Sequence, residues 1–288
     1  MARSSASLPT VHRFVAAVER AGGTVPPPIQ ALLNAADRIA TPRPVQDLVS
    51  QVIDELVSGE TDDARLEALL EKGAKQQGID AFRGDAARRA ESVLIQRLHV
   101  KFETGCADTL LDSLRGKFDK AAEQIALAHS LIPAEAPLEQ FLATATPKAI
   151  KAWQELPASI ATVDQIAGLA AAFGWRQTNA LFPMLVPYSL GDGTALDDRA
   201  LWATDGNPVA DSAQFARPDR GGRESPWFRI APLLRLHTLE SARERVRAWS
   251  EIEWEAMNSG SRPLVLNAEG QYRELPRQAN PYKQKASV

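Results

Sequence analysis

Histidine and aspartate side chains are the residues whose types and spacing bear on metal binding or acid–base catalysis. The four histidines are His12, His99, His129 and His237, and none has a second histidine or cysteine at the spacing of a zinc site. Aspartates instead gather in one segment, at Asp192, Asp197, Asp198, Asp205 and Asp211. Their spacing does not match an EF-hand loop, so solvated loop carboxylates are favoured over a cation site. We therefore predict no bound metal, no cofactor and no assigned catalytic residue.

Sequence motifs for phosphate binding and nucleophilic catalysis are also missing. The chain contains no GxxxxGK[ST] loop, no GxGxxG after a strand and no GxSxG elbow. Its single cysteine, Cys106, cannot form an internal disulfide and fits a reducing compartment. A buried thiol on a helix is favoured over a nucleophile there. The segment from Asp164 to Leu181 outlines a helix-turn-helix, but the late Gly174 and Pro183 favour an ordinary helical pair.

A local basic region with aromatic residues runs from residue 217 to residue 249. Its arginines are Arg217, Arg220, Arg223, Arg229, Arg243, Arg245 and Arg247, and its aromatic residues are Trp227, Phe228 and Trp249. Arginine with aromatic side chains can bind single-stranded nucleic acid, but the same residues are enriched in protein interfaces. A solvated helix face is the third interpretation. Nucleic-acid binding is the least favoured of the three.

The proline-free stretch from Ile79 to Ile132 is expected to position the rest of the fold. From Ala107 onward its apolar residues are spaced alternately four and three apart, which is the heptad pattern of a helical bundle or coiled coil. Upstream, from Phe82, they recur every four residues, so that stripe winds around the helix. The two patterns meet at Gly105, which predicts a bend in one helix or a junction of two. Close approach of another backbone is the alternative explanation of this glycine.

Shorter helices are expected on both sides of the central stretch. Four short helices before it could pack as a bundle on its beginning. After Pro133, the pair Thr146-Pro147 should begin a helix that Pro157 ends. A capping-box pattern from Thr162 to Gln165 should then open the next helix. All six tryptophans follow residue 150, which indicates two differently packed halves.

These patterns predict a mainly α fold. It comprises an N-terminal helical bundle, a long central helix or helical hairpin, and an irregular C-terminal part with one small β-hairpin within residues 264–275. The expected divisions are 1–78 (short-helix bundle), 79–133 (long central helix or hairpin), 134–186 (helical segment), 187–226 (irregular loop or linker) and 227–288 (amphipathic helix, hairpin and loose tail).

Composition excludes several broad classes. The net charge of −3 gives no global basic field for bulk nucleic-acid binding. No run of about 18 apolar residues is present, so no membrane helix is predicted. The N-terminal residues lack an apolar core followed by a cleavage site. We expect a cytoplasmic protein with no membrane partner.

The leading hypothesis is a non-catalytic structural or assembly protein. It would form a homo-oligomer, expected to be a dimer, through a seam of Leu111, Leu114, Phe118 and Ile125. A partner protein would bind a surface of Trp227, Arg243, Arg247 and Trp249. One alternative is an enzyme whose active site lies in the Asp-rich segment 187–226 against Trp202. The other is a nucleic-acid-binding protein that uses the region 217–249.

Overall fold

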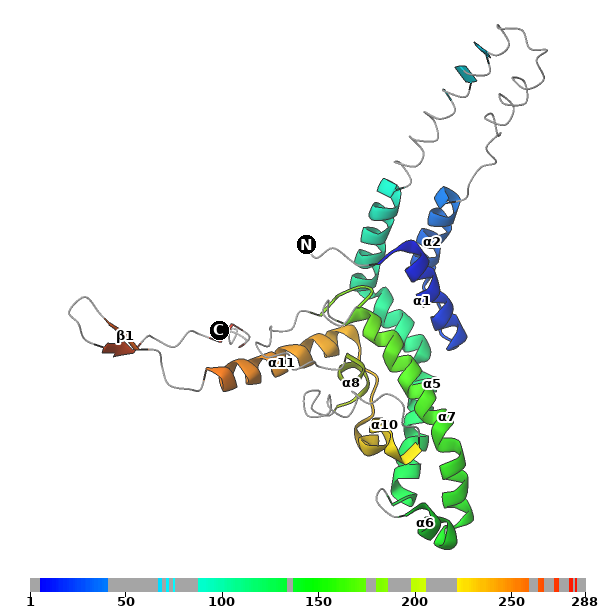
Figure 1. The fold of residues 1–288 in the computed structure, drawn as a ribbon, viewed down its shortest axis with the longest axis vertical. Coiled ribbons are helices and arrows are strands. Elements are labelled where there is room, and N and C mark those ends of the chain that lie inside the picture. Colours follow the sequence, from blue (N-terminus) through cyan, green and yellow to red (C-terminus); the bar gives the residue numbers. More distant parts are fainter. Residues whose placement is uncertain are drawn as a thin grey trace.

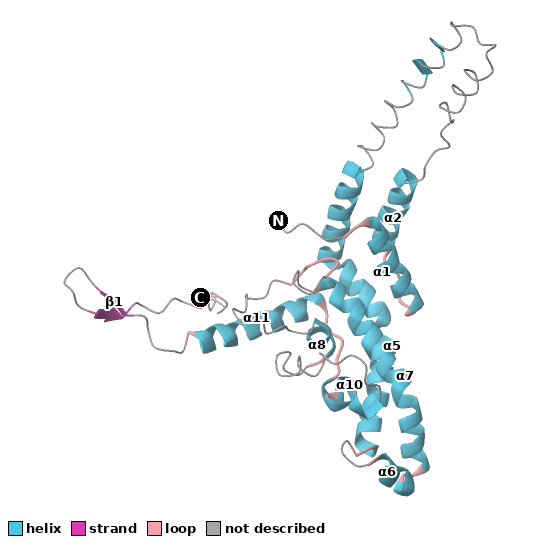
Figure 2. Ribbon diagram, viewed as in Figure 1, coloured by secondary structure: helices cyan, strands magenta, loops and turns pink. Residues whose placement is uncertain are grey.

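The computed structural model describes residues 6–40, 67–68, 71–72, 75, 88–133, 137–174, 180–185, 198–205, 222–258, 264–266, 272–274, 280–281 and 283. Helices dominate these residues, which confirms the prediction of a mainly α fold (Figure 2). The helical elements are α1 (Leu8–Arg20), α2 (Pro27–Ala40), residues 88–101, η1 (Phe102–Cys106), α5 (Ala107–Leu131), α6 (Leu138–Thr144), α7 (Pro147–Ala170), η2 (Ala171–Phe173), α8 (Asp198–Ala203), η4 (Gly222–Glu224), α10 (Pro226–Arg229), η5 (Ala231–Leu233) and α11 (Leu239–Met257).

The central helix bends where its two apolar patterns meet. Residues 88–101 lead directly into η1, a π-helical turn, and then into α5. Within this turn, Thr104 has φ −91° and ψ 23°, and Gly105 has φ +116°. A Cβ atom added to Gly105 would meet no atom within 4 Å. The glycine is therefore needed for its positive φ, which other residues rarely adopt, and close backbone approach does not explain it.

α5 and α7 form the body of the molecule. They lie side by side as an antiparallel pair, with α6 at the end where the chain turns back (Figure 1). Ser159 on α7 is buried and donates a hydrogen bond of 2.8 Å to the side-chain oxygen of Gln124 on α5. α7 begins as predicted, because the Thr146 hydroxyl accepts a hydrogen bond from the Ala149 amide at 3.3 Å.

The predicted break at Pro157 is wrong. α7 continues through this proline from Pro147 to Ala170. Pro157 lies on the exposed side of α7, where water can bind the carbonyl that loses its helical partner. Its neighbours Leu156 and Ile160 are buried, and this packing holds the helix together. Thr162 does not cap a new helix, because its hydroxyl donates back to the Ala158 carbonyl at 2.9 Å.

α1 and α2 cover another side of α5. Lys117 on α5 donates a hydrogen bond of 2.8 Å to the Ala21 carbonyl, and the Thr24 amide donates to Ser113 at 2.9 Å. A Cβ atom at Gly23 would lie 2.9 Å from Leu114, so only glycine fits between this turn and α5. The predicted third helix of the N-terminal bundle lies outside the described residues, and residues 67–75 are described only in part.

An aromatic cluster holds the bend in the central helix. Phe102, at the start of η1, lies 5.1 Å from Phe173 and 4.7 Å from Phe182 between ring centroids. Phe14 packs on Phe173 at 5.7 Å, and Trp202 packs on it at 6.5 Å. These rings come from both halves of the sequence. One core therefore joins the two halves of the sequence.

The C-terminal third contains helices and one pair of strands in its described residues. The segment 187–226 was predicted to be irregular, yet α8 lies in it, and Trp202 on that helix has no exposed surface. The rest of the segment, 187–197 and 206–221, lies outside the described residues. Further along, β1 (Leu264–Leu266) pairs antiparallel with β2 (Tyr272–Glu274), and Val265 is opposite Arg273. Near the C-terminus, Lys283 forms an ion pair of 2.9 Å with Glu255 on α11.

Among the described residues, one helix has the length and composition to cross a membrane. Pro147–Phe173 spans 27 residues, and its most apolar window has a mean hydropathy of 1.3. Inside the folded chain 50% of that window is buried, and its buried side packs on α5 as a core helix does. The sequence rule that required an uninterrupted apolar run missed this helix, because small and polar residues are interspersed along it.

Candidate functional site at the base of helix α11

The predicted seam lies inside the chain. Leu111, Leu114, Phe118 and Ile125 each have 0% exposed surface. They face other helices, as predicted, but these helices belong to the same chain, with α7 on one side and the α1–α2 turn on another. The four side chains were predicted to lie between copies of the chain, but within this chain they have no exposed area on which a second copy could pack. α7 is long enough to cover this face of α5, because the helix runs past Pro157.

The predicted partner surface also divides between core and exterior. Trp227 and Trp249 are 2% and 8% exposed, so both are core residues. The Trp227 indole N–H donates to Asp164 on α7 at 3.1 Å, and Arg243 pairs with Glu103 in η1 at 3.3 Å. Arg247 is exposed. The two tryptophans therefore fix the C-terminal third to the body. They were predicted to bind a partner, but they expose almost no surface to one.

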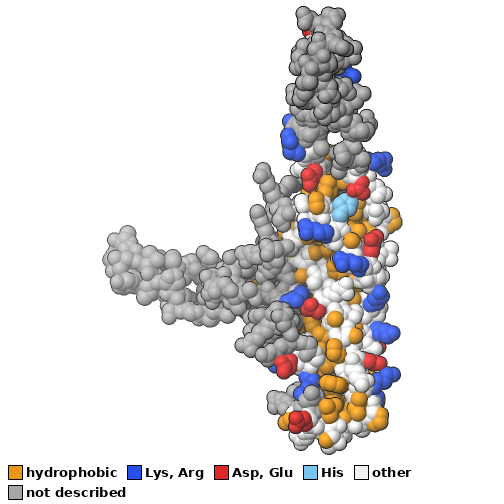
Figure 3. Space-filling model, turned by 45° about the vertical axis from the view of Figure 1, so that its right-hand side comes forward, with side chains coloured by type: hydrophobic (Ala, Val, Ile, Leu, Met, Phe, Trp, Pro, Cys, Tyr) orange, Lys and Arg blue, Asp and Glu red, His pale blue; other side chains and the backbone are white. Residues whose placement is uncertain are grey.

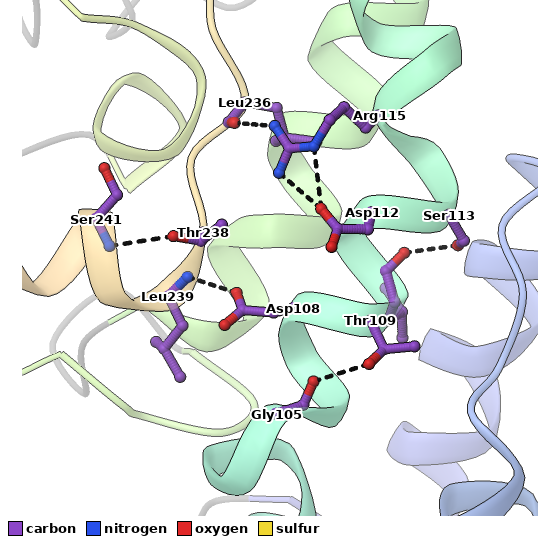
Figure 4. Close-up of polar contacts among 11 residues, drawn as sticks. Gly105, Asp108, Thr109, Asp112, Ser113, Arg115, Leu236, Thr238, Leu239 and Ser241 are labelled. Atoms are coloured by element: carbon purple, nitrogen blue, oxygen red, sulfur yellow. Dashed lines mark hydrogen bonds and ion pairs between the residues drawn. The ribbon is translucent and has the colours of Figure 1, made fainter.

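The first turn of α11 is tied to α5 through polar contacts (Figure 4). Asp108 on α5 accepts a hydrogen bond of 2.6 Å from the Leu239 amide, one of the amides that a helix start leaves without an internal partner. The Thr238 hydroxyl accepts from the Ser241 amide at 3.2 Å and acts as the N-cap. Arg115 on α5 donates to the Leu236 carbonyl and also pairs with Asp112. α11 thus begins at a defined place on α5.

A short backbone pairing brings α8 against the residues that precede α11. The Arg235 amide donates to the Ala203 carbonyl at 2.9 Å, and the His237 amide donates to the Trp202 carbonyl at 2.9 Å. This pairing extends from the bridge between Thr204 and Leu234. It places the residues just after α8 beside the His237 side chain.

His237 is the centre of a buried polar cluster. Its Nδ1 lies 2.9 Å from the Ser241 hydroxyl. Its Nε2 lies 3.0 Å from the Thr204 carbonyl, 3.4 Å from an Asp205 carboxylate oxygen and 3.1 Å from Arg245. The imidazole is only 4% exposed. The cluster joins α8, the segment 233–237 and α11 into one polar contact.

The cluster borders an open pocket of about 340 Å³. Its walls are Asp112, Arg115, Arg235, Leu236, His237, Thr238 and Ser241. Two arginines and one aspartate give the lining an excess positive charge when His237 is neutral. The volume lies at the lower end of the range for small-molecule sites. The pocket can therefore admit a small group to Ser241.

Comparison of the chain with protein-family models, curated proteins and solved structures gives no match. Its function has to be argued from the residues themselves. Among the described residues, no group of three or more His, Cys, Asp and Glu side chains is arranged to hold a metal ion. Burial raises the pKa of the Cys106 thiol, which disfavours the thiolate that a nucleophilic cysteine requires.

Sequence reasoning missed the His237 cluster, although part of it was readable. Ser241 follows His237 by only four residues, across the predicted Thr238 cap, so the two lie close together in the sequence. Asp205 and Thr204 lie more than thirty positions upstream, and only the fold brings them to the imidazole. Asp205, one of the aspartates singled out in the sequence, lies in this cluster.

His237 should make stability depend on pH. Burial, followed by the Arg245 guanidinium, lowers the pKa of His237 from its ordinary value of 6.5, while the Thr204 carbonyl and Asp205 oppose this shift without reversing it. Between the folded and unfolded pKa values the unfolded chain binds more protons, so the free energy of unfolding falls as the pH drops below about 6.5. One group contributes a slope of at most about 1.4 kcal/mol per pH unit. Urea unfolding across this range should give a shallower slope for His237→Gln, and equal slopes would contradict the assignment.

Proposed function

We propose that the chain is a cytoplasmic structural protein that assembles with copies of itself through helix α11. The observation that carries this proposal is the placement of α11, which begins on the body at Leu239 and runs away from the α5–α7 pair (Figure 1). In its first turns the side chains of Leu239, Ala242 and Val246 are buried against the body. Beyond Trp249, Ile252 is 68% exposed, the highest value among the large hydrophobic side chains in the described part of the chain.

Helix α11, which we call the arm, needs a rigid base, and the α5–α7 body supplies it. Its core runs from α1 to the buried face of α11, and the aromatic cluster fixes the bend beside the arm. The polar contacts from Asp108 and Arg115 orient the first turn of α11. Directional hydrogen bonds of this kind set an angle more closely than apolar contact does.

The exposed side of α11 is complementary to itself. Arg247 and Glu251 lie four residues apart on the helix, with Ala248 and Ile252 beside them. An antiparallel second copy of α11 brings Arg247 of each chain toward Glu251 of the other and buries both Ile252 side chains. This is the isologous contact of a twofold dimer.

We also propose that β1 and β2 belong to one hairpin that extends this docking region, and that residues 1–78 complete the N-terminal bundle.

Replacing Ile252 with Asp is expected to convert the oligomer to a monomer. Burying an isoleucine contributes about 2 kcal/mol, so losing it should weaken association roughly thirtyfold or more. The folded monomer should keep its melting temperature, because the side chain is exposed there. Light scattering at tens of micromolar measures the mass. Val93→Asp, at another exposed apolar position, is the control and should leave the mass unchanged. A monomeric wild type would refute the proposal.

The nucleic-acid alternative gains no support from the visible surface. On the face in Figure 3, the Lys and Arg side chains of the described residues are interspersed with Asp and Glu. Within the region 217–249, Arg243 and Arg245 pair with Glu103 and Asp205. Binding along a phosphate backbone needs a continuous basic strip, and the described residues on this face do not form one.

A further inference from the structure

Ser241 and His237 have the relation of a nucleophile and its base. The serine hydroxyl lies 2.9 Å from His237 Nδ1, within direct proton-transfer distance. The opposite ring nitrogen, Nε2, is held by the Thr204 carbonyl at 3.0 Å and has an Asp205 oxygen at 3.4 Å. A nucleophile bonded to a base that a third group orients is the arrangement that activates serine for acyl transfer.

The contacts of Nε2 decide which ring nitrogen is the base. The Thr204 carbonyl can accept a hydrogen bond from Nε2 at 3.0 Å, and an Asp205 carboxylate oxygen lies 3.4 Å away. Arg245, at 3.1 Å, can only donate. The Thr204 carbonyl, with the Asp205 carboxylate close by, favours the tautomer with hydrogen on Nε2. The Arg245 guanidinium also lies 3.7 Å from Asp205. Nδ1 then carries the lone pair and accepts from the Ser241 hydroxyl. Burial keeps the imidazole neutral near pH 7, which a general base requires.

The pocket gives Ser241 access to a substrate. Ser241 is half-buried and lines the 340 Å³ pocket together with Thr238. Arg115 and Arg235 also line it and supply positive charge where a carbonyl oxygen becomes negative. A pocket of this size accommodates a short acyl group and excludes a long one.

We propose that Ser241 is a nucleophile for acyl transfer from small esters, with His237 as general base and acid and with Asp205 and the Thr204 carbonyl as positioning groups. The Ser241 oxygen bonds to the ester carbonyl carbon while its proton moves to His237 Nδ1. The bond to the leaving alcohol then breaks, and the alcohol takes that proton. Water next attacks the acylated serine, again through His237, and releases the carboxylic acid. This activity is separate from the proposed assembly role, and it gives the enzyme alternative a defined centre.

A fluorophosphonate probe tests the proposal on the full chain, because it labels activated serines whatever the natural substrate. The expected result is one label, mapped by peptide mass spectrometry to Ser241 and absent from Ser241→Ala. His237→Gln should slow labelling about a hundredfold, the usual contribution of a general base. Ser130→Ala, at an exposed serine on α5, is the control and should label as wild type. A folded wild-type chain that does not label at Ser241 overturns the proposal.

A second readout covers the case in which His237→Gln does not fold. The labelling rate of the wild type should rise with pH through a single ionisation, that of His237, and should then level off. A rate that rises continuously with hydroxide concentration would show an ordinary serine and overturn the proposal. p-Nitrophenyl acetate should give a burst of nitrophenol equal to the enzyme concentration. The Ile252→Asp variant should label normally, so failure of the assembly proposal and failure of this one are distinguishable.

Discussion

Replacing Leu114 with Asp is expected to cause the largest loss of stability among the single substitutions proposed for this chain. Leu114 has 0% exposed surface and packs against the turn at Gly23. An aspartate there would lose the apolar contact and bury a carboxylate without a partner, which should cost about 4 kcal/mol or more. That is a large part of the total stability of an ordinary domain. The melting temperature, followed by circular dichroism, should fall by on the order of 10 °C or more.

Leu127→Asp is the matched control for this experiment. It makes the same chemical change on the same helix, at a position that is 41% exposed. Exposed substitutions usually change stability by less than about 0.5 kcal/mol, so its melting temperature should stay close to wild type. Equal losses in the two variants would show that α5 does not bury the face containing Leu114.

Gly105→Ala and Gly116→Ala are expected to change stability in opposite directions. Both glycines lie in the central helical run, and a Cβ atom at either position meets no other atom within 4 Å. Gly105 has φ +116°, so alanine would be strained there, at a cost of about 1–3 kcal/mol. Gly116 lies inside α5, where alanine is favoured over glycine by about 1 kcal/mol. Chemical denaturation of the two variants measures the sign of each change in the free energy of unfolding.

Gly105→Ala and Gly116→Ala together separate the effect of backbone conformation on stability from the effect of packing, because neither substitution creates a clash. A stabilising effect at both positions would show that the chain can straighten the π-helical turn at little cost. A destabilising effect at both would mean that Gly116 also departs from regular helix. The expected opposite signs require a left-handed residue at position 105 and a helical one at position 116.

Local patterns in the sequence predicted the main axis of the fold well. The heptad spacing identified the buried face of α5, and Gly105 marked the change of pattern where the helix bends. These features depend on residues close together in the chain. The error at Pro157 had a different origin, because an exposed proline can remain in a helix when buried neighbours hold that helix in place. Only the partner helix, α5, supplies this information.

The candidate site was harder to predict for the same reason. A tryptophan on an amphipathic helix fits a core and an interface equally well, so Trp227 and Trp249 were assigned to a surface although both are buried. His237 has no second histidine or cysteine at the spacing of a metal site, so the sequence pattern does not single it out. Its relation to Ser241 is local, but its contacts with Thr204 and Asp205 require the backbone pairing between α8 and the residues before α11.

Helix α11 is fixed to the body at its first turn, so a rotation there displaces its far end. Its 19 residues give a length of about 28 Å, so a rotation of about 10° at the base moves the far end by about 5 Å. The pivot is formed by charged and polar side chains, chiefly Asp108, Arg115 and the groups around His237. A group that enters the adjoining pocket would therefore act next to the pivot. A displacement too small to disturb the core would be amplified along the arm, and the geometry of an assembly built on α11 would change with it.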